Sequence, residues 1–143
     1  MELIHSKQDT AKLLHIVYRK EDLVNQQQRG VNISPDAMAL QLRAISAKKG
    51  EVFPDHKHPP QHRTTDRTQE SLVIIQGSAK ATLYDTDDTA LLSTVLKAGD
   101  SIITFEGGHR YEILEDKTLI YEHKNGPYNG LEKDKVMIGG PDA

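Results

Sequence analysis

The sequence predicts an all-β fold, a single barrel or jelly roll made of short antiparallel strands. Short apolar runs recur along the chain, and several of them alternate polar and apolar side chains, which is the period of a half-buried strand. Clusters of Gly, Pro, Asn and Asp separate these runs at the spacing of about 8 to 12 residues that is typical of sandwiches and barrels. With 143 residues, the chain is expected to form one domain around a single core.

Composition excludes several classes of function. The net charge is −3, from 18 basic and 21 acidic residues, so the chain lacks the basic footprint of a nucleic-acid-binding protein. It contains no cysteine, which excludes disulfides, thiolate catalysis and cysteine-ligated zinc. The first residues lack the apolar run of a signal peptide, and no stretch reaches the length of a membrane span. We therefore expect a cytoplasmic protein that binds neither nucleic acid nor membrane.

The amino-terminal segment, residues 1–37, is predicted to be an extension of the barrel. Residues 13–18 are rich enough in β-branched and aromatic side chains to form a strand, and residues 21–24 open a helical turn. Ser34-Pro35-Asp36 is a turn signal. This segment cannot bury a core alone, so we expect it to pack on the barrel or on a second copy of the chain, and we predict a homodimer.

Residues 38–130 carry the predicted barrel, and residues 131–143 form a charged carboxy-terminal tail. Residues 59–69 contain no hydrophobic side chain other than two prolines and are expected to form a loop at the barrel mouth. The predicted strands of the barrel cover residues 38–47, 51–58, 71–76, 79–84, 91–96, 101–105, 110–114 and 118–123.

The chemistry-bearing residues gather between Gly50 and Glu112. His56 and His58 stand two positions apart, so on an extended strand both project from the same face. Glu70 begins a later strand, and His109 follows the Gly107-Gly108 turn. If these faces look into one barrel, the side chains converge on one point, and imidazole with carboxylate suits a first-row transition metal.

These motifs resemble the cupin superfamily, whose members are small double-stranded β-helix barrels. Gly50, His56, His58, Glu70 and Gly77 match the first cupin motif in type and order, and the six residues between Glu70 and Gly77 match its spacing. Gly99, Gly107 and His109 match the second motif in order. The resemblance covers residues 38–124 and implies that His56, His58, Glu70 and His109 bind one divalent transition metal, which is Fe, Mn, Ni or Zn.

The chain also departs from the cupin pattern. Eleven residues separate His58 from Glu70, where three or four are usual, and His62 within this gap is a rival ligand to Glu70. In the second motif, Phe105 replaces a proline, His109 comes one residue early, and Ile113 replaces an asparagine. The fourth ligand, Glu70 or His62, is therefore left open.

Three further residues are candidates for contact with a ligand or substrate. Arg63 and Arg67 lie in the long polar loop and could pair with an anionic group, although arginines in such loops are more often merely solvated. Tyr111 lies two residues after His109 and shares its face of the strand. Alternatively, Tyr111 is a core aromatic residue.

The cupin resemblance implies a fold and a metal more directly than a reaction. Cupins include dioxygenases, sugar isomerases and epimerases, decarboxylases and plain binding modules. We expect an enzyme that acts on a small polar substrate, such as a carbohydrate or sugar derivative, through a metal that serves as a Lewis acid. The alternative is a non-catalytic module that binds a small ligand or a metal and has a regulatory or scaffolding role.

Overall fold

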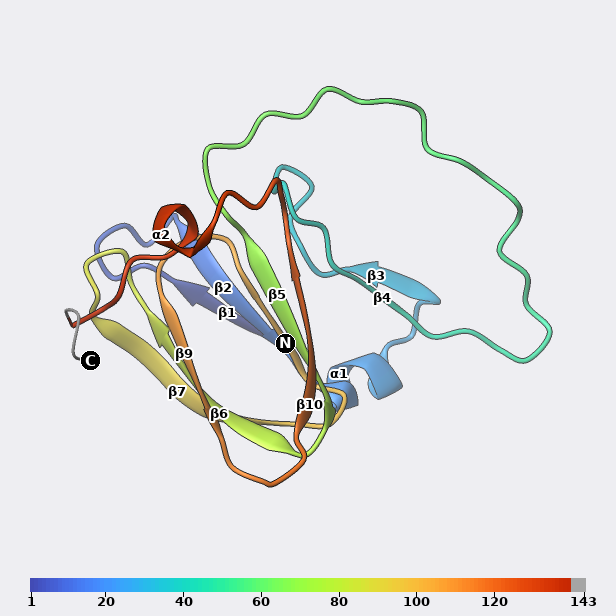
Figure 1. Ribbon diagram of the computed structural model, residues 1–143. Helices are drawn as coiled ribbons and strands as arrows, with labels where there is room; N and C mark the ends of the chain where they lie inside the picture. The colour runs from blue at the N-terminus through green and yellow to red at the C-terminus, as the bar shows by residue number, and fades with distance from the viewer. Residues whose placement is uncertain (140–143) are drawn as a thin grey trace.

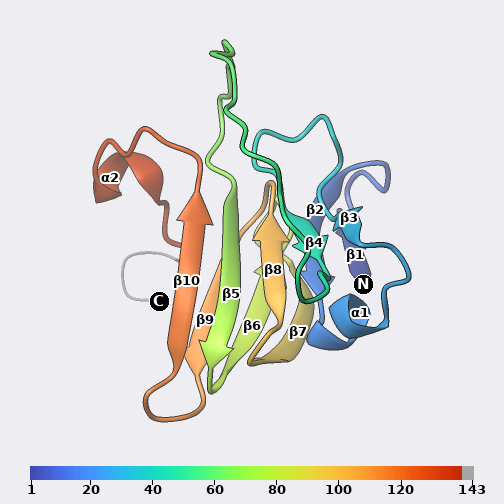
Figure 2. The same cartoon turned by 90° about the vertical axis from the view of Figure 1, so that its right-hand side faces the viewer.

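The structure is a computed structural model that describes residues 1–139 of the chain. Two antiparallel sheets lie face to face and enclose the core, and a long loop projects away from them (Figure 1). Seen from the side, strands of the larger sheet lie in front of strands of the smaller one (Figure 2). Most of the regular structure is β, as the sequence predicts, and no closed barrel forms within the described residues.

The larger sheet has five strands. In spatial order they are β1 (Glu2–His5), β2 (Leu13–Tyr18), β8 (Ser101–Thr104), β5 (Glu70–Gln76) and β10 (Leu119–Lys124). Every neighbouring pair is antiparallel, and Leu72 of β5 lies opposite Ile102 of β8 on one side and Glu122 of β10 on the other. This register places alternate side chains of β5 in the core.

The smaller sheet has three strands. They are β7 (Ala90–Lys97), β6 (Ser78–Tyr84) and β9 (His109–Ile113), in that order. Gly77 joins β5 to β6 with a positive φ of 76°, which glycine adopts without steric cost. The chain thus passes from the larger sheet to the smaller one within one residue.

Two short helices and one pair of short strands complete the regular structure of the described residues. β3 (Gly30–Asn32) and β4 (Arg43–Ile45) pair with each other beside the larger sheet. The helices are α1 (Lys20–Asn25) and α2 (Leu131–Asp134). No helix in residues 1–139 is long and apolar enough to cross a membrane.

The larger sheet carries apolar side chains on both faces. Its inner face meets the smaller sheet in a core that consists of Val17, Leu72, Ile74, Ala79, Ala81, Leu83, Leu96 and Ile102. Its outer face is covered around β2 and β8 by the segment that contains β3 and β4, in a second cluster of Ile16, Tyr18, Ile33, Ala44, Ile103 and Phe105. Both clusters remove apolar surface from water and stabilise the sandwich.

Most predicted strands are confirmed, and two predictions fail in the first half of the barrel. The strand predicted over residues 38–47 is reduced to Arg43–Ile45. The strand predicted over residues 51–58 is wrong for this structure, because the segment is exposed and pairs with no neighbour. A strand needs a partner for its backbone groups, and alternation in the sequence does not supply one. The predicted loop at residues 59–69 is irregular through residue 69.

The amino-terminal segment pairs within its own chain. Tyr18 of β2 lies opposite Ser101 of β8, and β1 continues the sheet beyond β2. The predicted tail begins with α2, and its residues 140–143 lie outside the described residues. Because β8 provides the partner that the amino-terminal strands need, their pairing gives no reason to expect a homodimer.

Buried Asp85 fastens the amino-terminal segment to the end of β6. Its carboxylate accepts hydrogen bonds from the backbone N–H groups of Lys7, at 2.6 Å, and Thr86, at 2.8 Å. Burial acts to raise the pKa of Asp85, but these bonds and one from the Ser6 hydroxyl outweigh it and lower the pKa to about 2.

Asp85 is therefore expected to make the stability of the fold depend on pH. Its folded-state pKa lies below its unfolded value, so its contribution is complete above about pH 4 and is lost as the pH falls through about 2. Urea unfolding should show that wild type exceeds Asp85→Asn in stability at pH 6, and that the difference shrinks at pH 2.5. A difference that stays constant over this range would contradict the assignment.

Both sheets have a free edge on the same side of the sandwich. Among residues 1–139, β9 pairs only with β6, and β10 pairs only with β5. The two edge strands are consecutive in the chain and frame the space between the sheets (Figure 1). Unpaired edges carry backbone donors and acceptors that can bind a further strand.

Candidate metal and ligand site

Glu70 and His109 face each other between the two sheets. Glu70 is the first residue of β5 and His109 the first of β9, so each sheet contributes one side chain. His109 Nε2 lies 3.1 Å from Glu70 Oε1. Both side chains are largely buried, with exposed fractions of 24% for His109 and 8% for Glu70.

The surroundings favour the ionised form of Glu70. Burial acts to raise its pKa, but the hydrogen bond from His109 and the nearby charges of His109, Lys135 and Lys124 outweigh burial, so the pKa is lowered. An ionised carboxylate beside an imidazole nitrogen presents two donors of electron pairs to the same point when that nitrogen carries no hydrogen. That donor set suits a divalent transition metal.

Tyr111 lies beside this pair, as its position in the sequence predicts. Its ring centroid is 5.1 Å from that of His109. Burial raises the pKa of the Tyr111 phenol, and the charge of Glu70 raises it further. Tyr111 therefore remains a neutral phenol at physiological pH, able to donate a hydrogen bond to a ligand.

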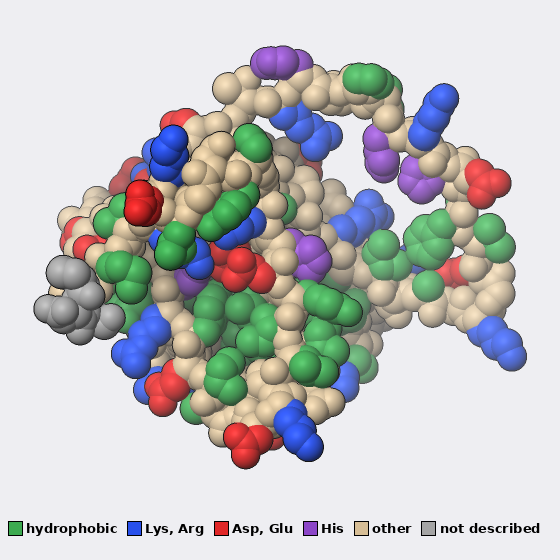
Figure 3. Space-filling view, viewed as in Figure 1, with side chains coloured by type: hydrophobic (Ala, Val, Ile, Leu, Met, Phe, Trp, Pro, Cys, Tyr) green, Lys and Arg blue, Asp and Glu red, His purple; other side chains and the backbone are tan. Residues whose placement is uncertain are grey.

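A cavity of about 710 Å³ adjoins Glu70, His109 and Tyr111. In the space-filling view, apolar side chains occupy the space between β9 and β10, with charged groups nearby (Figure 3). The cavity is of the size that binds small molecules.

The segment after β10 covers part of this cavity. Lys135 through Ile138 contribute to its lining. Asp134 holds the segment in place, because it accepts hydrogen bonds from Lys124 Nζ at 2.9 Å and from the Thr68 hydroxyl at 3.1 Å. The sequence pattern of this segment predicts only a charged tail, because its position at the site depends on contacts between residues far apart in the chain, such as Thr68 and Asp134.

His56 and His58 lie apart from Glu70 and His109. They occupy the long exposed loop between β4 and β5, which stands clear of the sandwich in Figures 1 and 3. Their rings contact each other with centroids 5.3 Å apart, and His56 Nδ1 lies 2.8 Å from the Pro54 carbonyl oxygen. His62 is exposed on the same loop. Within residues 1–139, no cluster of three or more His, Cys, Asp or Glu side chains could hold a metal ion.

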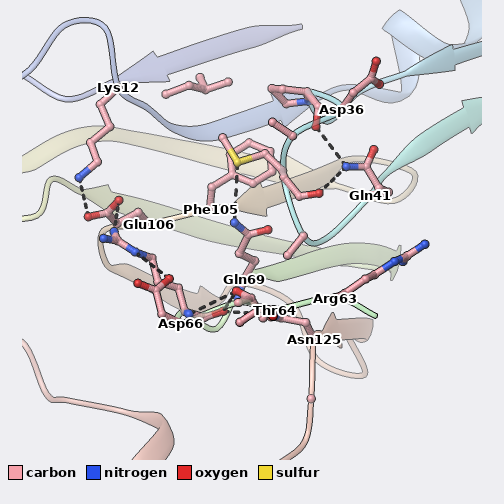
Figure 4. Close-up of a pocket in the computed structure, with 18 of the residues that line it drawn as sticks. Lys12, Asp36, Gln41, Arg63, Thr64, Asp66, Gln69, Phe105, Glu106 and Asn125 are labelled. Atoms are coloured by element: carbon pink, nitrogen blue, oxygen red, sulfur yellow. Dashed lines mark hydrogen bonds and ion pairs between the residues drawn. The ribbon is translucent and has the colours of Figure 1, made fainter. Parts of the chain in front are cut away.

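Arg63 and Arg67 line a different cavity, of about 1140 Å³, on the outside of the larger sheet. Arg67 forms an ion pair with Glu106. Glu106 also accepts a hydrogen bond from Lys12 at 2.7 Å, which the close-up in Figure 4 shows. Gln69 is directed into this second cavity region, whereas its neighbour Glu70 faces the first one. Consecutive residues at a strand end point to opposite faces, so the arginines are separated from Glu70 by the sheet itself.

Gln69 and Asn125 anchor the last part of the long loop. The Asn125 side chain accepts a hydrogen bond from Gln69 N at 2.6 Å and donates one to the Arg67 carbonyl at 2.9 Å. The ion pair between Arg67 and Glu106 adds a second attachment. The loop is thus fastened to the sandwich immediately before Glu70, while residues 51–62 are exposed.

The geometry of Glu70 and His109 fits half of a metal site. Two ligand atoms bound at about 2.1 Å, with an angle between 90° and 109° at the metal, stand about 3.0 to 3.4 Å apart. The observed separation of 3.1 Å lies in this range. The described arrangement therefore supplies two converging donors, and two further donors would have to come from elsewhere in the chain.

Comparison with family models, with curated proteins and with solved structures found no match to this chain. The functional argument therefore depends on the residues themselves and on their arrangement.

Proposed function

We propose that this protein is a metal-binding cupin that holds one divalent transition metal through His56, His58, Glu70 and His109. The observation that carries the proposal is the convergence of Glu70 and His109 from two sheets beside a cavity of about 710 Å³. A histidine and a carboxylate at this separation have the chemistry of metal ligands. The metal would be Fe, Mn, Ni or Zn.

The other two ligands would arrive by strand addition. His109 lies on β9, whose outer edge is free, and residues 51–58 form an exposed segment with no partner. Pairing of this segment with β9 would satisfy backbone groups of both and would begin to close the sandwich into a barrel. His56 and His58 would then project from one face.

The length of the loop permits this movement. Eleven residues separate His58 from Glu70, and they can span about 36 Å when extended. Ordering the loop costs conformational entropy, which metal binding would offset. Folding of the loop and binding of the metal would therefore be coupled.

The cavity beside Tyr111 would accept a small polar substrate, such as a carbohydrate or a sugar derivative. A bound metal would supply Lewis-acid chemistry there. The Tyr111 phenol stays protonated and would donate a hydrogen bond to an oxygen of the substrate. We propose an enzyme, of the isomerase, epimerase or dioxygenase type.

One observation favours the alternative of a non-catalytic binding module with a regulatory or scaffolding role. Arg63 and Arg67 lie in the other cavity, which leaves fewer polar groups beside the proposed metal than the sequence suggests. A panel of sugars and oxo-acids would distinguish the two functions. Turnover supports the enzyme, whereas metal-dependent binding without turnover supports the module.

Metal uptake is the direct test of the proposal. Protein equilibrated with Fe(II), Mn(II), Ni(II) or Zn(II) and then desalted is expected to retain about one metal per chain, measured by elemental mass spectrometry. We expect Glu70→Ala to weaken metal binding more than His62→Ala, because Glu70 already converges on His109. The reverse order would make His62 the fourth ligand, and no uptake of any of the four metals would contradict the proposal.

A further inference from the structure

A second histidine, His15, is fully buried close to the candidate site. It lies on β2, and both of its ring nitrogens have partners. Nε2 lies 2.9 Å from the Tyr84 carbonyl oxygen, and Nδ1 lies 3.0 Å from the Thr104 hydroxyl. A carbonyl can only accept, so Nε2 carries the hydrogen and the Thr104 hydroxyl donates to Nδ1.

His15 is a neutral donor in this arrangement. Burial lowers its pKa to about 4, although the hydrogen bond to the Tyr84 carbonyl acts in the opposite direction. The ring therefore adds no positive charge near the proposed metal ligands at physiological pH. Its contribution is a directed N–H group and the volume that it fills.

The Tyr84 carbonyl connects His15 to the turn that precedes His109. Tyr84 and Gly108 exchange two backbone hydrogen bonds, from Tyr84 N at 2.8 Å and from Gly108 N at 3.3 Å. Gly107 has a positive φ of 82°, and a Cβ there would collide with the Tyr84 carbonyl oxygen and lie 3.2 Å from His15 Nε2. The turn thus packs directly against the hydrogen-bonded pair of His15 and Tyr84.

The His109 ring lacks the orienting bond that most metal-binding histidines have. Such a histidine usually donates its second N–H to a carboxylate, a carbonyl or a water. His109 Nδ1 is buried and has no hydrogen-bond partner among the described residues. The direction in which Nε2 points toward Glu70 is consequently set by the backbone turn and by the neighbouring Tyr111 ring.

We propose that His15 is a positioning residue for His109. Its N–H fixes the Tyr84 carbonyl, that carbonyl fixes the Gly107-Gly108 turn, and the turn aims His109 Nε2 at Glu70. The part of this inference that concerns metal affinity rests on the proposed function, but the positioning of the ring does not. Neither composition nor spacing in the sequence indicates this role.

Two substitutions separate the hydrogen bond of His15 from its volume. His15→Leu fills much of the space without a donor, whereas the amide N–H of His15→Gln can reach the position of Nε2 and donate to the Tyr84 carbonyl. Competition with a coloured chelator for Zn(II) should show metal binding at least about 10-fold weaker in His15→Leu and within about 1.5-fold of wild type in His15→Gln.

Leu96→Ala is the matched control for lost stability. Leu96 is fully buried, and it pairs with Ala79 at the end of β6 opposite to Tyr84. This variant should lose stability in urea unfolding but keep wild-type Zn(II) affinity. If His15→Leu and Leu96→Ala both retain wild-type affinity, or if His15→Gln binds as weakly as His15→Leu, the positioning role is contradicted.

A milder variant and a measurement on metal-free protein are two further tests of the positioning role of His15. If His15→Leu does not fold, Thr104→Val is the alternative variant, because it removes only the hydroxyl that holds the tautomer of His15. Thr104→Val should weaken Zn(II) binding about threefold, and unchanged affinity would contradict the inference.

In metal-free protein, the nuclear Overhauser contact between the His109 and Tyr111 rings should persist in His15→Gln and weaken in His15→Leu. If this contact persists equally in both variants, the positioning role of His15 is contradicted. If wild type binds no metal but the contact changes as expected, the positioning role stands and only the proposed metal-binding function is contradicted.

Discussion

His109→Ala is expected to weaken binding of the proposed metal at least about 100-fold while the chain still folds. The substitution removes one of the two donors that already converge in the structure, and the other, Glu70, cannot hold a metal alone. The fold should survive because a domain of 143 residues buries enough apolar surface to stand without a metal.

Competition with a chelator for Zn(II) would measure the loss of metal binding, and thermal unfolding in the presence of chelator would show whether the variant folds. His123→Ala is the matched control, because His123 is an exposed histidine of β10 that lies opposite Ser71, so it occupies the other face of the strand from Lys124, the residue opposite Glu70. The control should bind metal like wild type. If His109→Ala binds metal with wild-type affinity, the proposed metal site is contradicted. If this variant does not fold, His109 is a structural residue, and the alternative of a binding module is favoured.

Asp100→Ala is expected to lower the free energy of unfolding by about 3 kcal/mol, the largest stability effect that we predict. Asp100 is 5% exposed and joins two parts of the chain, the start of α1 and the turn between β7 and β8. It accepts hydrogen bonds from the backbone N–H groups of Lys20, at 2.9 Å, and Lys97, at 3.0 Å, and it pairs with Arg19 at 3.2 Å. Removal of the carboxylate leaves these donors without their acceptor.

Urea unfolding of wild type and Asp100→Ala would measure the change, with Asp116→Ala as the control. Asp116 lies exposed in the turn between β9 and β10, so its removal should change the stability by no more than about 0.5 kcal/mol. Equal, small effects of both substitutions would mean that Asp100 does not hold the amino-terminal helix and the β7–β8 turn together.

Local sequence patterns were sufficient to predict the second half of the fold. The strands that became β5 through β10 carry alternating or buried-type apolar side chains and are bounded by Gly and Asp turns. The short connections around Gly77 and Gly99, whose positive φ angles allow tight turns, carry the chain from one sheet to the other. Tyr111 beside His109 follows from the period of a strand alone.

Patterns in the first half were less decisive. The pattern of residues 51–58 predicts a strand, yet their backbone pairs with no strand among the described residues. Residues 2–5 carry no clear strand pattern, yet they form β1 and pair with β2. Pairing depends on which edges are available, and availability is a property of the whole fold. The position of Arg63 and Arg67 in a second cavity is likewise set by the whole fold and not by the local sequence pattern.

The sequence by itself determined a mostly β chain and the residue types of the proposed metal site, because strand periodicity and ligand chemistry are local properties. Only the tertiary structure decided that Glu70 and His109 meet at 3.1 Å and that His56 and His58 lie on an exposed loop. It also decided that His15 supports the turn before His109. These contacts join residues far apart in the chain, and they are set by the register and packing of two sheets, which no local pattern specifies.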